Sequence, residues 1–180
     1  MDISKITEYL YISSEPQDGH SDEPNTRDIR LVISMIGGHS PPEVFTQLPY
    51  RMLWLKTFDS ILMPIPMSIL LRGAHTALAT IKDGGSVLVY CAKGRHRSVA
   101  MAAAILISVG YTAHQAMGLI RTHRQAADPG AWHIQQRIKL FEKCLRNKIS
   151  RPGGVGGLVE TYSEFVAALV SNIILHSGFL

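Results

Sequence analysis

The segment VLVYCAKGRHRSVAMAAAILI, from Val87 to Ile107, constrains the chain more than any other stretch. Four apolar residues lead into Cys91, a short basic loop follows, and an alanine-rich run comes next. Crowded cations repel one another, so an ordinary turn from a strand into a helix gains nothing from them. We therefore expect a buried strand, a loop that holds an anion, and a helix. The basic side chains of the loop are Lys93, Arg95, His96 and Arg97.

Apolar runs and helical periodicity alternate along the first 150 residues. Short apolar runs predict strands over 9–13, 31–36, 51–55 and 87–90. Apolar spacing predicts helices over 66–82, 98–109, 112–123 and about 131–146, the last with Trp132, Ile138, Phe141 and Leu145 inward. The alternation predicts an α/β fold with a mostly parallel central sheet and helices on its faces. Ligands of such sheets bind beyond the carboxyl ends of the strands, and Cys91 is the first residue past such an end.

Composition narrows the class of protein. A chain of 180 residues with 46% hydrophobic and 18% charged residues can bury a core and is not typical of a disordered protein. The net charge of +4 favours anionic ligands. No basic stripe is interleaved with aromatic residues, so we expect no nucleic-acid partner.

The two cysteines, Cys91 and Cys144, form no CxxC pair and no Cys/His cluster at zinc spacing. We therefore expect no disulfide framework, no metal site and no cofactor. The opening MDISKITEYLYIS lacks the apolar region of a secretory signal, which predicts a cytoplasmic protein.

The composition changes after residue 150. We expect a catalytic domain over 1–150, then a glycine-rich linker and an apolar C-terminal helix over 151–180. The apolar stretch is too short to span a bilayer, so we expect no membrane span. Docking of this tail on its own domain or on a second subunit is the favoured interpretation. Membrane-surface binding is the alternative, although such helices usually carry a basic polar face.

The order Cys91-Ala-Lys-Gly-Arg-His-Arg97 has a direct physical interpretation. If the loop curls, its backbone N–H groups point into one cavity, where the start of the next helix also favours an anion. Gly94 supplies a backbone conformation that a side chain would forbid, and Arg97 can hold two oxygens of a tetrahedral oxyanion. The same donors stabilise a thiolate, which makes Cys91 a nucleophile. Cys144 has no such neighbours, and we expect it to be structural.

Cys91, Gly94, Arg97 and Ser98 match the pattern C-x-x-G-x-x-R-[ST], through which the chain resembles the cysteine-based protein tyrosine phosphatases, most closely their dual-specificity branch. The resemblance extends from Met1 to about Leu145. It implies metal-independent hydrolysis of phosphate monoesters through a phosphocysteine intermediate. The implied substrate is a phosphoprotein that carries phosphotyrosine, or also phosphoserine or phosphothreonine. It assigns phosphate binding to Ala92, Lys93, Gly94, Arg95, His96 and Ser98.

The same resemblance implies an acid about thirty residues before the cysteine. Asp59 lies thirty-two residues before Cys91 and directly follows an expected strand, which makes it the candidate general acid. Asp83 belongs to the turn KDGG and is a weaker candidate. The hydroxyl of Ser98 is expected to donate a hydrogen bond to the departing thiolate.

Two features depart from the family pattern. Tyr90 precedes the cysteine where the family usually has histidine, and the loop is unusually basic. Lys93, Arg95 and His96 either face solvent or serve a polyphosphorylated small molecule, such as an inositol polyphosphate or pyrophosphate. Two other classes stay open: a binding module that holds phospho-ligands without turnover, and a rhodanese-like sulfurtransferase, whose loop is generally one residue shorter.

Overall fold

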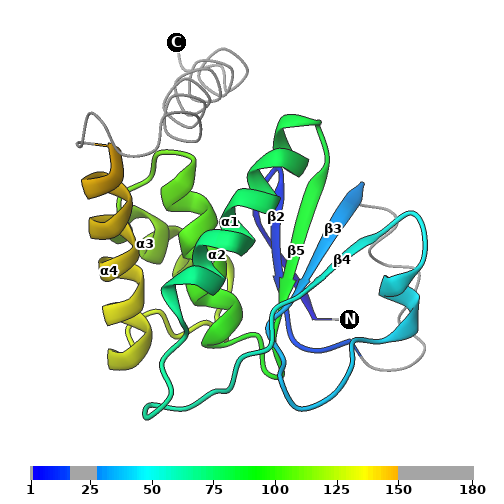
Figure 1. Ribbon diagram of the computed structural model, residues 1–180, viewed down its shortest axis with the longest axis horizontal. Helices are drawn as coiled ribbons and strands as arrows, with labels where there is room; N and C mark the ends of the chain where they lie inside the picture. The colour runs from blue at the N-terminus through cyan, green and yellow to red at the C-terminus, as the bar shows by residue number, and fades with distance from the viewer. Residues whose placement is uncertain (1, 17–27, 150–180) are drawn as a thin grey trace.

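The computed structural model describes residues 2–16 and 28–149, and a five-stranded sheet forms its centre (Figure 1). The order across the sheet is β1-β2-β5-β3-β4, and only β1 runs antiparallel to its neighbour. All five residues of β5 are buried, as expected for a central strand with both neighbours parallel. The α/β class with a mostly parallel sheet is therefore confirmed. The strands are β1 (Ile3–Thr7), β2 (Leu10–Ser13), β3 (Ile29–Ser34), β4 (Arg51–Trp54) and β5 (Ser86–Tyr90).

The register of the parallel strands brings their carboxyl ends to one edge. Tyr90, the last residue of β5, pairs with Ser13 of β2 and with Ser34 of β3. Ser34 also pairs with Trp54, the last residue of β4. The loops that leave these strands therefore meet at the carboxyl end of the sheet, where Cys91 follows β5.

Four helices pack together beside the sheet: α1 (Met67–Lys82), α2 (Arg97–Ser108), α3 (Ala113–His123) and α4 (Trp132–Ile149). Every residue of α2 is buried, because this helix lies between the sheet and its helical neighbours α1, α3 and α4. Its alanines allow that close approach. Thr112 caps α3 through a reciprocal capping box with Gln115, which confirms the start predicted from the sequence.

Side-chain alternation divides the sheet into two faces. Val87 and Val89 point into the larger apolar cluster, which contains the buried faces of all four α-helices. Leu88 and Tyr90 point into a second cluster, which Phe45 of the short 3₁₀ helix η2 (Glu43–Thr46) covers. In the described chain the four α-helices therefore lie on one face of the sheet, where helices on both were expected (Figure 1).

The structure differs from the sequence predictions in several places. The strand β1 was not expected as a separate element, and α4 continues to Ile149. Trp132 was expected inward, which is wrong: it begins α4 with 68% of its surface exposed, whereas Ile138, Phe141 and Leu145 are buried. The linker and helix expected over 151–180 lie outside the described residues. Within the described part of the chain, no helix combines the length and apolar character needed to cross a bilayer.

Candidate active site

The loop from Cys91 to Arg97 joins β5 to α2 and is fixed by close backbone packing. Gly94 adopts φ +59°, and a Cβ built on it would lie 2.6 Å from the carbonyl oxygen of Ser13. Any side chain here would meet rigid backbone as well as an unfavourable conformation. The glycine predicted from the motif is therefore required by the loop.

A buried arginine that the sequence analysis did not single out, Arg124, fixes the backbone of the loop after β5. Arg124 donates from Nε to the carbonyl oxygen of Gly94 at 2.8 Å. Its Nη2 donates to Asp2 Oδ2 at 2.7 Å, and its Nη1 donates to Ser4 Oγ at 3.0 Å. These bonds tie the loop to the N-terminal hairpin. Asp2 and Arg124 are 122 residues apart, so no local pattern signalled the pair.

The thiol of Cys91 is buried at the start of this loop. Its Sγ lies 3.2 Å from Ser98 Oγ, the contact expected from the motif. Burial raises the pKa of Cys91, but hydrogen bonds from the Ser98 hydroxyl, from the backbone N–H groups of Ser98 and Arg95, and the charge of Arg97 outweigh it. The net effect is a pKa below the ordinary value, which favours a thiolate nucleophile.

Arg97 is held in a fixed orientation at the start of α2. Its Nη1 donates to the carbonyl oxygens of Met35 and Thr57, at 2.8 and 2.9 Å. Its Nε is buried and has no hydrogen-bond partner among the described residues. A buried guanidinium donor without a partner is costly, so a bound oxyanion would satisfy it.

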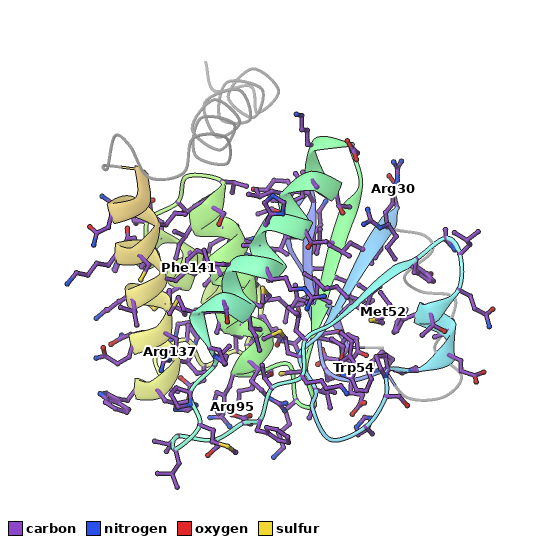
Figure 2. The ribbon with its side chains drawn as sticks, viewed as in Figure 1. Arg30, Met52, Trp54, Arg95, Arg137 and Phe141 are labelled. Atoms are coloured by element: carbon purple, nitrogen blue, oxygen red, sulfur yellow. The ribbon has the colours of Figure 1, made fainter. Side chains whose placement is uncertain are left out.

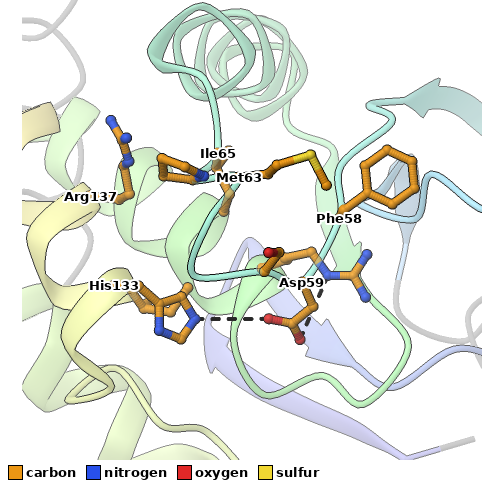
Figure 3. A pocket seen from close by; sticks show the side chains of 10 residues that line it. Phe58, Asp59, Met63, Ile65, His133 and Arg137 are labelled. Atoms are coloured by element: carbon orange, nitrogen blue, oxygen red, sulfur yellow. Dashed lines mark ion pairs between the residues drawn. The ribbon is translucent and has the colours of Figure 1, made fainter.

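Asp59 lies at the mouth of the loop, as its candidate role requires. Its Oδ2 is 3.9 Å from Arg97 Nε, and its Oδ1 is 3.3 Å from His96 Nδ1. His133, from α4, approaches the same Oδ1 to 3.9 Å (Figure 3). The structure thus brings Asp59, His96 and Arg97 together and adds His133, which the sequence analysis did not single out. Asp83 caps the far end of α1, before β5 begins, and is not part of this site.

The remaining residues of the loop line its outer side. Ala92 and Lys93 are exposed. Arg95 is half exposed and contacts Asp128 Oδ2 at 3.3 Å through its Nη2. Its backbone N–H group, rather than its side chain, faces the thiol.

Tyr90 lies on the opposite face of the sheet from the helices. Its ring packs against Phe45, with ring centroids 6.0 Å apart. Burial raises the pKa of Tyr90 to about 12, so its hydroxyl stays protonated at neutral pH. Tyr90 therefore supports the loop by packing and supplies no titrating group behind it.

A small pocket adjoins the mouth, between the loop after β4 and the start of α4 (Figure 3). Figure 2 shows Arg95 and Arg137 at this same end of the molecule. Arg137 was missed because α4 lies far from the motif in sequence and carries no local signature. The pocket is lined by Phe58, Asp59, Ser60, Met63, Pro64, Ile65, Arg97, His133, Ile134 and Arg137.

Comparison with known proteins gives matches among phosphatases. The chain is 34% identical to dual specificity phosphatase 28 of Mus musculus over 77 residues, which are 41% of this chain and 45% of that protein. It is 27% identical to dual specificity protein phosphatase 1B of Arabidopsis thaliana over 147 residues, 81% of this chain and 84% of that protein. No protein-family model matches the chain.

Solved structures share the fold. The crystal structure of a tyrosine-to-histidine variant of human DUSP28 superimposes with a TM-score of 0.74 at 19% identity, covering 82% of this chain and 99% of that one. The structural likeness supports the fold. The sequence matches to the mouse and plant proteins agree with the resemblance to dual-specificity phosphatases that the motif indicated. The chain is therefore similar in sequence to dual-specificity phosphatases and shares the fold of their solved structures.

Proposed function

We propose that the protein hydrolyses phosphate monoesters of phosphotyrosine, and of phosphoserine or phosphothreonine, through a phosphocysteine intermediate. One arrangement carries the proposal: a thiol of lowered pKa lies under a loop whose arginine has an unpartnered buried donor, beside a carboxylate at the mouth. A sulfurtransferase would not need that carboxylate. A binding module would need neither the nucleophile nor the acid.

Each group then has a defined task in each step of the reaction. Cys91 attacks phosphorus while Arg97 and the loop N–H groups hold the other phosphate oxygens. The bond to the leaving oxygen breaks, and Asp59 gives that oxygen a proton. In the second step Asp59 takes a proton from water, which attacks the phosphocysteine and releases phosphate. Ser98, 3.2 Å from the sulfur, stabilises the departing thiolate.

The nucleophile is tested by Cys91→Ser. We expect this variant to lose hydrolysis of an aryl phosphate but to bind tungstate nearly as well as the parent, because the loop N–H groups and Arg97 remain. Rates and tungstate binding by calorimetry are measured on the same preparations. Cys144→Ser is the matched control and should retain full activity. Hydrolysis by Cys91→Ser at the parent rate would contradict the mechanism, and tungstate binding without turnover in the parent would identify a binding module.

A second candidate substrate is a polyphosphorylated small molecule of the inositol polyphosphate or pyrophosphate kind. It is favoured by the side chains of Lys93 and Arg95, which extend from the outer side of the loop, and by Arg137 in the adjoining pocket. A single phosphate is already satisfied by the loop and Arg97. Further cations near it would bind additional phosphates of the same molecule.

The two substrates are separated by a charge-matched comparison. The double variant Lys93→Ala/Arg95→Ala should lose kcat/KM for an inositol polyphosphate while hydrolysis of a small aryl phosphate is spared. The control Arg72→Ala/Lys139→Ala removes the same charge from exposed positions on α1 and α4. If the two double variants have the same kcat/KM values for the inositol polyphosphate and for the aryl phosphate, Lys93 and Arg95 are solvated rim residues. The phosphoprotein then remains the proposed substrate.

A further inference from the structure

Three metal-binding side chains from separate segments meet at the mouth of the site. Asp59 comes from the loop after β4, His96 from the phosphate loop and His133 from the first turn of α4. One donor atom of each lies within 4.8 Å of the others. Their side chains are 37%, 22% and 16% exposed, so solvent ions can reach them.

We propose that Asp59, His96 and His133 bind a transition-metal dication of the Zn²⁺ or Co²⁺ type, and that the bound ion holds the enzyme inactive. The proposed chemistry gives Asp59 a role as acid but gives none to His133. The proposal that a metal ion binds depends only on the three side chains. The proposal that the ion inhibits hydrolysis also rests on the proposed function.

The two distances from Asp59 to the histidines are close to those of a tetrahedral site. Zinc bonds to imidazole nitrogen and carboxylate oxygen are about 2.0–2.2 Å, which places neighbouring donors about 3.3–3.5 Å apart. Asp59 Oδ1 and His96 Nδ1 already lie at 3.3 Å. His133 Nε2 lies 3.9 Å from the same oxygen and must approach by about 0.5 Å to reach the tetrahedral spacing. Rotation of partly exposed side chains can supply that shift.

The donor set selects the kind of metal. Two imidazoles and a carboxylate suit zinc, cobalt and nickel, whereas calcium and magnesium prefer oxygen ligands throughout. His96 also has an outer partner, because its Nε2 lies 3.9 Å from Asp128 Oδ2. A proton on Nε2 facing that carboxylate leaves the lone pair of Nδ1 free for the metal, as outer carboxylates do for histidine ligands.

The surrounding charges limit how tightly the ion is held. Arg97 Nε lies 3.9 Å from Asp59 Oδ2 and Arg95 lies nearby, and both repel a dication. The carboxylates of Asp59 and Asp128 and the thiolate of Cys91 oppose that repulsion. We expect binding that fills and empties reversibly, unlike a structural zinc site with four protein ligands.

Metal binding and catalysis compete for the same carboxylate. An oxygen of Asp59 that coordinates the ion no longer gives a proton to the leaving group. Three protein ligands leave a fourth position for water or a phosphate oxygen at the mouth of the loop. Both effects slow turnover, and removal of the ion restores it.

Binding is tested first, without reference to activity. In a full-length Cys91→Ser/Cys144→Ser background, which removes the thiol ligands, Co²⁺ is titrated and its visible absorption followed, with Zn²⁺ as competitor. We expect a band that saturates at one equivalent. His133→Gln and His96→Gln should each weaken binding by about tenfold or more. His114→Gln, at an exposed histidine of α3 outside the cluster, should bind as the background does.

Inhibition is then measured with all cysteines present. Each protein is compared with itself, with and without Zn²⁺, on a small aryl phosphate. We expect inhibition of the parent to be reversed by a chelator and to be weaker in His133→Gln. No cobalt band, or equal cobalt affinity in His133→Gln and the background, would overturn the site. A chain that binds cobalt through His133 but hydrolyses no phosphate ester would overturn the proposed function and leave the metal site standing.

Discussion

At the scale of single residues, the charge of Cys91 is set by groups that contact its sulfur. Because Ser98 lowers the pKa of Cys91 through its hydroxyl, removing that hydroxyl should raise it. The thiolate exists above the pKa, so Ser98→Ala should move the onset of reactivity to higher pH. The rate of alkylation by iodoacetamide against pH, followed by mass spectrometry in a Cys144→Ser background, measures this shift. An unchanged midpoint would show that the backbone N–H groups and Arg97 suffice.

Asp59 is tested by the dependence of its effect on the leaving group. Asp59→Asn should slow hydrolysis of a phenyl phosphate by about a hundredfold or more, the usual range for loss of a general acid. The loss should shrink for a nitrophenyl phosphate, whose leaving oxygen needs no proton. Asp83→Asn, at the far end of α1, is the control and should have little effect. A larger loss in Asp83→Asn would make the assignment of Asp59 wrong.

The residues of the site that could be predicted from sequence are those that share a local pattern. Cys91, Gly94, Arg97 and Ser98 lie within one short stretch, from the loop into the first turn of α2, so their spacing alone places them around one anion. Asp59 was reached through the resemblance and an expected strand. His133 and Arg124 could not be found in this way, because they reach the site through the packing of α4 and of the chain after α3.

At the scale of elements, the apolar patterns predicted the four α-helices of the described chain and the strands β2 to β5, but neither β1 nor the short 3₁₀ helix η2. β1 is a partly exposed strand at the edge of the sheet, with one buried residue in five, so it has no apolar run to mark it. Trp132 was placed inward by helical spacing. It stands at the first position of α4, where no neighbouring element covers it, and tertiary packing rather than periodicity decides its exposure.

Two helical glycines make a matched test of packing between elements. A Cβ on Gly118, in α3, meets nothing within 4 Å, so Gly118→Ala should stabilise by about 1 kcal/mol through helix propensity alone. A Cβ on Gly73, in α1, meets the side chain of Met101 in α2 and lies 3.0 Å from Leu55 Cδ1. Overpacking costs about 1–3 kcal/mol, which at least offsets that gain, so Gly73→Ala should lack the stabilisation of Gly118→Ala and should destabilise by up to about 2 kcal/mol. Urea unfolding measures both, and equal stabilisation by the two would show that α1 and α2 are loosely packed.

At the scale of the whole molecule, the two faces of the sheet have different roles. The α-helical face holds the larger apolar cluster and carries α2, whose first turn supplies Arg97 and Ser98. The other face is covered by η2 and places Tyr90 behind the loop. Strand and helix patterns indicate that layers exist, but they do not assign helices to a face, because each helix has the same apolar stripe in either arrangement.

The last prediction concerns residues 152–180, which lie beyond the described chain. Among the described residues, both apolar clusters are built from side chains between Ile3 and Leu145, on both faces of the sheet. A chain ending at Arg151 should therefore fold and retain hydrolysis of an aryl phosphate. The deleted stretch is rich in apolar residues, and its docking on the domain or on a second subunit would bury them. Its removal should then lower the melting temperature or the solution mass by light scattering, and no change in either would rule out docking.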